Sequence, residues 1–74
     1  MKWIDPNKQL PPQDELVLLE AEYGFVVGYY TTNSIENPEH NWWGQGYRKQ
    51  EDFWVFNVVR WCKLPKRFQT PPMH

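Results

Sequence analysis

Two apolar runs separated by a short polar interruption dominate the first half of the chain. The first run covers residues 16–21 and the second covers residues 24–32, with Tyr23 and Gly24 at the junction. The second run is rich in aromatic and β-branched residues, which favour strands, and a glycine supplies the positive φ that a tight turn needs. The pattern predicts two antiparallel strands joined as a hairpin.

A third run, residues 53–64, contains the same strand-forming residue types. From residue 59 onward it alternates, which predicts Trp61 on one face of a strand and Arg60 and Cys62 on the other. Asn57 interrupts the run. We expect a bulge or a tight turn at this position.

The residues outside these three runs, together with the prolines, indicate the fold class. Residues 33–52 are too long for a structureless loop in so small a domain, so we expect a short strand or an ordered loop within residues 42–49. The seven prolines of the chain each remove a backbone donor, which excludes them from helix interiors and central strands. We therefore expect an all-β protein with at most one short helix: a small antiparallel sheet or a partly open SH3-like barrel of four or five strands.

Length and composition indicate one domain with a ring-rich core. The 74 residues include five Trp, four Tyr and four Phe, and the single cysteine cannot form an internal disulfide. We expect one β domain over residues 1–68 and a flexible tail over 69–74. So small a domain without cross-links gains stability from self-association. A homo-oligomer is therefore expected, with its seam at a hairpin edge strand within residues 25–30.

The two ends of the chain carry a resemblance. Residues 3–4 (Trp-Ile), 10–12 (Leu-Pro-Pro) and 17–19 (Val-Leu-Leu), together with the closing 59–65 (Val-Arg-Trp-Cys-Lys-Leu-Pro), resemble a family of short phage and prophage proteins of unknown function. The resemblance covers roughly the first 20 residues and about eight near the end. It implies a small, phage-borne accessory protein without catalytic activity. The single cysteine and the lack of an apolar stretch long enough for a signal peptide predict a reduced protein in the cytoplasm, here that of the host cell.

The residues that catalysis needs are poorly placed. The histidines are His40, in an Asn/Pro/Glu segment, and the terminal His74, and the one serine is not in a nucleophile turn. A pair of Cys62 with His40 is conceivable, but a cysteine inside a strand is far more often an inert apolar side chain. The carboxylates of Glu20 and Glu22 share a strand face, where solvation is their usual role. We therefore expect no enzyme.

Cofactor and metal motifs are likewise missing from the sequence. Residues 44–46 (Gly-Gln-Gly) lack the third glycine and the following helix of a phosphate-binding loop, and no cysteines and histidines have zinc-site spacing. We expect neither a cofactor nor a metal.

The segment 42–49 is the candidate ligand site. Adjacent tryptophans on extended backbone face opposite ways, so one can enter the core and leave the other to stack on a planar ligand or a partner. Arginine and lysine beside them can bind phosphate. The alternative is that both rings fill the two faces of a thin sheet while the cations pair with Glu51 and Asp52. The predicted ligand-binding residues are Trp42, Trp43, Tyr47, Arg48, Lys49 and Arg60.

The net charge and the hydropathy of the chain limit the classes of partner that we expect. A net charge of −1 disfavours duplex nucleic acid, and no run approaches the roughly 20 apolar residues of a membrane span. The function we expect is a phage accessory binding protein that counteracts host defence by binding a defence protein or a small nucleotide-type signal. The alternative is a small barrel that binds single-stranded nucleic acid.

Overall fold

The computed structural model describes residues 2–32, 41–46 and 50–65. Within these ranges the protein is all-β and has no helix, which confirms the predicted fold class. The strands are β1 (Val17–Ala21), β2 (Gly24–Tyr30), β3 (Trp42–Gly44), β4 (Phe53–Trp54) and β5 (Val58–Lys63).

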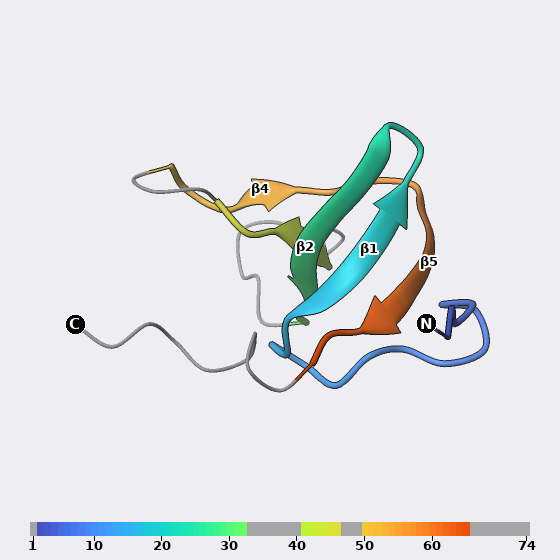
Figure 1. Cartoon of the computed structure of the whole chain (residues 1–74). Coiled ribbons are helices and arrows are strands. Elements are labelled where there is room, and N and C mark those ends of the chain that lie inside the picture. The colour runs from blue at the N-terminus through green and yellow to red at the C-terminus, as the bar shows by residue number, and fades with distance from the viewer. Residues whose placement is uncertain (1, 33–40, 47–49, 66–74) are drawn as a thin grey trace.

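All five strands belong to one antiparallel sheet in the order β4-β3-β2-β1-β5 (Figure 1). The predicted hairpin is its centre: β1 and β2 pair from Val17 opposite Gly28 to Ala21 opposite Gly24. Gly24 has a φ of 140°, a conformation that side chains oppose, which is why glycine stands at this turn. The two edge strands do not pair with each other, so the sheet is open.

The apolar run 53–64 is divided between the two edges of the sheet. Asn57, where a turn or bulge was predicted, lies in a bend between the two strands and has a φ of 59°, a left-handed conformation that asparagine tolerates. Residues 55–57 therefore form a crossover from β4 to β5, which passes behind the hairpin in Figure 1.

The prediction that the hairpin offers an edge strand for self-association is wrong, whereas the homo-oligomer itself stays a prediction. β2 lies between β1 and β3, and β1 lies between β2 and β5, so neither hairpin strand has a free edge. The physical reason is the crossover, because it brings β5 alongside β1 and uses the backbone groups that would otherwise be exposed.

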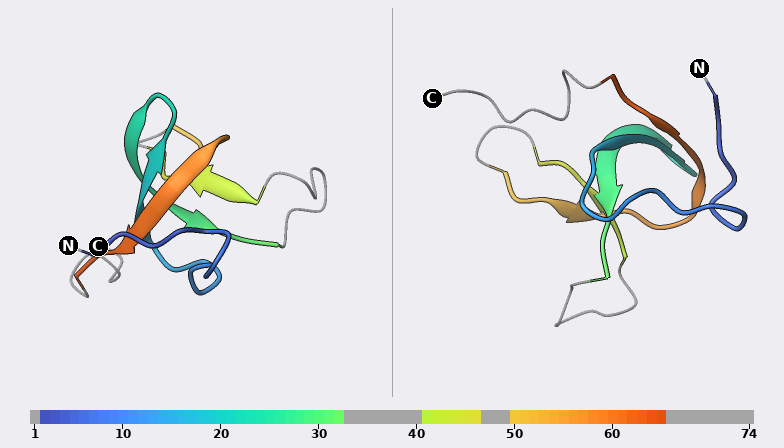
Figure 2. Two further views of the ribbon diagram at one scale, coloured as in Figure 1. Left: turned by 90° about the vertical axis from the view of Figure 1, so that its right-hand side faces the viewer. Right: turned by 90° about the horizontal axis from the view of Figure 1, so that it is seen from below.

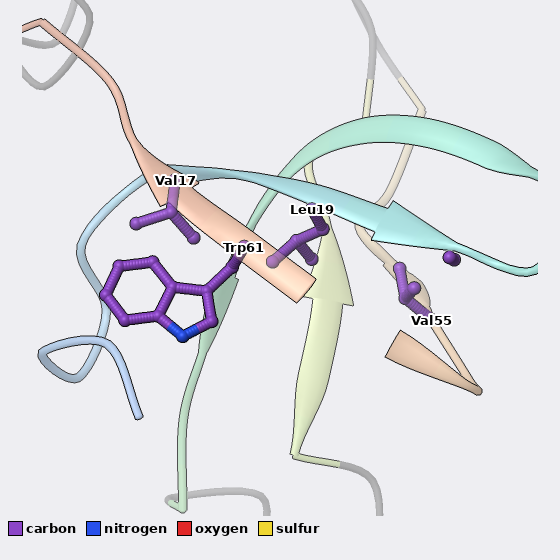
Figure 3. Close-up of a cluster of buried hydrophobic side chains, with 5 residues drawn as sticks. Val17, Leu19, Val55 and Trp61 are labelled. Carbon is purple, nitrogen blue, oxygen red and sulfur yellow. The ribbon is translucent and has the colours of Figure 1, made fainter. Parts of the chain in front are cut away.

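One face of the sheet, here called the core face, carries the hydrophobic core. Val17, Leu19 and Trp61 are fully buried on it, and Val55 of the crossover is fully buried against them (Figure 3). The register places Leu19 opposite Trp61, so the alternation predicted for the last strand is confirmed at the core position. The crossover thus covers the core face of the sheet that it connects.

The N-terminal segment, residues 2–10, runs beside β5 (Figure 2). Ile4 and Trp61 exchange backbone hydrogen bonds at 2.8 and 3.0 Å, and the Trp61 indole N–H donates to the Gln9 carbonyl at 2.9 Å. These contacts join the N-terminal segment to the last strand of the sheet. The predicted tail 69–74 lies outside the described residues, and those that are described include no helix that could cross a membrane.

Candidate binding surface

The strand register gives the sheet a second, aromatic face opposite the core. Because neighbours in register point to the same side, Tyr29, Trp43 and Trp54 share a face across β2, β3 and β4. Glu20 of β1 lies opposite Phe25 of β2 and opposite Arg60 of β5, so these three residues are on the same face as well. We call this side the outer face; its register-placed members are Leu18, Glu20, Phe25, Val27, Tyr29, Trp43, Trp54, Arg60 and Cys62.

The two adjacent tryptophans of the predicted site are on opposite faces. Trp42 lies opposite Tyr30, makes an edge-to-face contact with its ring at 5.0 Å between centroids, and packs against the core. Trp43 lies opposite Tyr29 on the outer face and is half-buried. The two rings therefore cannot stack together on one ligand.

Arg60, the second cation of the predicted site, is committed elsewhere. Its guanidinium forms an ion pair with Glu20 on β1 and lies 4.4 Å from the centroid of the Trp3 ring. β1 and β2 separate it from the tryptophans of β3. Trp3 also contacts Phe25, at 5.8 Å between ring centroids, and so covers part of the outer face.

The other three predicted site residues, Tyr47, Arg48 and Lys49, lie outside the described residues. Asp52, which the alternative interpretation paired with those cations, accepts hydrogen bonds from the Tyr29 hydroxyl at 2.6 Å and from the Gly46 N–H at 2.9 Å. Its two carboxylate oxygens thus tie β2 to the segment that connects β3 and β4.

Partial burial and the contact with Asp52 change the pKa of the Tyr29 hydroxyl. Partial burial, followed by the hydrogen bond to Asp52 and its charge, raises the pKa of Tyr29. The hydroxyl of a tyrosine in the unfolded chain ionises at about pH 10. The folded state therefore holds this proton more tightly, and the resulting stability is present below about pH 10 and lost as the pH rises through the folded pKa.

Replacing Tyr29 with phenylalanine should flatten the pH dependence of stability in that alkaline range. We expect the loss of unfolding free energy between about pH 9 and pH 11 to be smaller in Tyr29→Phe than in the unmodified protein, measured by urea denaturation at both pH values. Tyr23→Phe removes a hydroxyl that does not contact Asp52 and serves as the control. Parallel losses in all three proteins would contradict the assignment.

Sequence reasoning missed three exposed rings at the end of the hairpin, here called the aromatic patch: Tyr23, Trp54 and Phe56. The centroid of Phe56 lies 5.9 Å from that of Tyr23 and 5.3 Å from that of Trp54. Their exposed fractions are 56% for Tyr23, 44% for Trp54 and 47% for Phe56, so the rings are in contact with one another and accessible together. The signal in the sequence was the two-residue spacing of Trp54 and Phe56.

A side-chain contact holds the crossover against the hairpin turn beneath this patch. The Asn57 amide donates to the Glu22 carboxylate, joining the residue after Phe56 to the residue before Tyr23. Asn57 is also the left-handed residue of the crossover. The segments that carry Tyr23 and Phe56, two of the three rings, are therefore held in position by backbone conformation and a charge-assisted hydrogen bond.

The nucleophile considered in the sequence is buried. Cys62 is 1% exposed, and burial raises the pKa of its thiol although Arg60 nearby lowers it, which makes it a poor nucleophile. His40 lies outside the described residues. Over the ranges 2–32, 41–46 and 50–65, no group of three or more His, Cys, Asp or Glu side chains is arranged to hold a metal ion.

Comparisons of the chain with protein-family models, curated proteins and solved structures gave no match.

Proposed function

We propose that this protein is a non-enzymatic binding module that recognises a partner protein through the aromatic patch. The observation that carries the proposal is a row of three half-exposed rings in which Phe56 contacts both Tyr23 and Trp54. Tryptophan, tyrosine and phenylalanine are enriched at protein interfaces, and a few clustered rings commonly supply most of the binding energy. Three such rings would otherwise expose apolar surface to water at a cost.

The supporting structure of the patch favours binding as well. Aromatic side chains have few rotatable bonds, so immobilising them costs little conformational entropy. The hydrogen bond from Asn57 to Glu22 holds the crossover and the turn together before any partner arrives. A surface arranged in advance loses less free energy to ordering on association.

The charged side chains on and beside the outer face indicate which kind of partner the aromatic patch would bind. In the described ranges Glu20 and Arg60 pair with each other on the outer face, and the carboxylates of Glu22 and Asp52 accept hydrogen bonds from Asn57 and Tyr29. Single-stranded nucleic acids and nucleotides need free cations beside the stacking rings. This arrangement instead favours a protein with an apolar recess bordered by lysine or arginine.

The resemblance at the two chain ends supports a biological setting for the same activity. A small accessory protein of a phage, acting in the host cytoplasm, would use such a patch to bind a host defence protein and oppose it. A nucleotide-type signal remains the alternative target, and single-stranded nucleic acid is the alternative from a different class.

Photo-crosslinking followed by calorimetry tests the proposal. p-Benzoylphenylalanine placed at position 56 in a bacterial host should crosslink one host protein, and the same probe at Leu10, an exposed residue of the N-terminal segment, should not. With that protein purified, Phe56→Ala and Trp54→Ala should each weaken the dissociation constant about thirtyfold, corresponding to about 2 kcal/mol, whereas Leu10→Ala should change it less than about twofold.

Three outcomes would overturn the proposal. Equal weakening by Leu10→Ala and Phe56→Ala would remove the patch from the interface. A crosslink between two copies of this chain would assign the patch to self-association. Saturable quenching of tryptophan fluorescence by an oligothymidylate at physiological salt, lost in Trp54→Ala, would favour the nucleic-acid alternative.

A further inference from the structure

A second recess lies away from the aromatic patch, where the N-terminal segment meets the end of β5. It has a volume of about 330 Å³ and is lined by Lys2, Ile4, Gln9 and Lys63. Lys63 lies opposite Val17 in the register, two residues after Trp61, and therefore on the core-face side of β5. Residues from the two ends of the described chain thus form one pocket.

The walls of this pocket are held in place by hydrogen bonds. Ile4 and Trp61 exchange two backbone bonds, and the Trp61 indole N–H donates to the Gln9 carbonyl at 2.9 Å. Between these anchors the N–H groups of Lys8 and Gln9 both donate to the Asp5 carbonyl, at 2.9 and 3.0 Å, which closes a compact turn. The pocket is therefore a preformed feature of the fold.

The charge of the pocket is one-sided. Its described lining includes two lysines and no carboxylate. The ion pair found in the described ranges joins Arg60 to Glu20 on the outer face, so neither Lys2 nor Lys63 is neutralised by a carboxylate there. Two ammonium groups at one recess repel each other, and an anion between them would replace that repulsion by two attractions.

We propose that this pocket binds a small phosphate-bearing molecule, with Lys2 and Lys63 contacting the phosphate from opposite walls. Lysine binds phosphate as a compact charge with three donors, and two of them match a dianion. Half-buried Ile4 offers an apolar wall to the rest of the ligand, and Gln9 offers a polar one. The volume lies at the lower end of ligand pockets, which limits the ligand to a small phosphorylated compound.

This site is independent of the proposed protein-binding function. It uses none of the residues of the aromatic patch and lies on the core-face side rather than the outer face. Either proposal can therefore fail without the other.

Titration with inorganic phosphate and pyrophosphate, followed by two-dimensional NMR of backbone and indole N–H groups at constant ionic strength, tests the site. We expect saturable shifts at Ile4, Gln9 and the Trp61 indole, because the last donates its proton at the pocket wall. Pyrophosphate should bind more tightly than phosphate because it carries more charge. Lys2→Gln and Lys63→Gln should each weaken binding at least about fivefold.

Lys8→Gln is the matched control, because Lys8 is an exposed lysine of the same segment that does not line the pocket. It should leave the dissociation constant unchanged. All three replaced side chains are exposed, and unchanged spectra without ligand will verify that the variants fold. Absence of saturable shifts below about 10 mM pyrophosphate would overturn the proposal. Equal weakening by Lys8→Gln would also do so, because it would indicate only general charge attraction.

Discussion

Replacing Trp61 with alanine is expected to remove about 3–5 kcal/mol from the free energy of unfolding, by the measure of large-to-small substitutions in protein cores. Trp61 is fully buried, lies opposite Leu19 and donates its indole N–H to the Gln9 carbonyl. A domain of this size is stable by only about 0.05–0.15 kcal/mol per residue. Trp61→Ala should therefore leave a substantial unfolded population, measurable by urea denaturation and by the loss of dispersed NMR signals.

Trp42→Ala is the matched comparison, because it removes the same side chain from a half-buried position. Trp42 contacts Tyr30 and the core but remains partly exposed, so its loss should cost about 1–2 kcal/mol. Leu10→Ala, at an exposed side chain, should cost less than about 0.5 kcal/mol. Equal losses of unfolding free energy in Trp61→Ala and Trp42→Ala would contradict this prediction, because they would mean that the core depends equally on both tryptophans.

Gly28→Ala is expected to be the most damaging addition of a single methyl group in the described sheet. A Cβ at Gly28 would lie 2.1 Å from the Trp43 carbonyl oxygen and 2.9 Å from Leu19 Cδ1. The first contact is with backbone, so β2 and β3 must separate to relieve it. We expect a loss of at least about 3 kcal/mol, above the usual cost of overpacking, measured by thermal and urea denaturation.

Gly24→Ala separates this close approach from backbone strain. Gly24 has a φ of 140° but nothing lies within 4 Å of an added Cβ, so the substitution tests conformation alone. It should cost about 1–2 kcal/mol. If Gly24→Ala were as damaging as Gly28→Ala, the tight contact between β2 and β3 would not be the reason for glycine at position 28.

Local sequence patterns were sufficient for the central elements. The apolar runs around Tyr23 and Gly24 predicted the hairpin, because strand propensity and turn chemistry act between residues that are close in sequence. Asn57 was correctly identified as a turn or bulge for the same reason. The opposite facing of Trp42 and Trp43 followed from the pleat of a strand, which needs no tertiary information.

The arrangement of the functional surface could not be predicted in this way. The run 53–64 looks like one strand, and its division between opposite edges depends on where a crossover leads rather than on the residues within it. Arg60 was assigned to a ligand site with the tryptophans because its own position does not reveal that Glu20, forty residues earlier, lies opposite it. Tyr23 and Phe56 meet only because the crossover passes the hairpin turn.

The sequence by itself determined the all-β class, the central hairpin, the alternation that buries Trp61 and the turn at Asn57. Each of these features depends on propensities and periodicities within a few residues. The tertiary structure decided which strands form the edges, which cation is neutralised, and which rings and lysines gather at a surface. These features are contacts between residues about 30 to 60 positions apart, formed when the crossover and the N-terminal segment close over the sheet, and no local pattern encodes them.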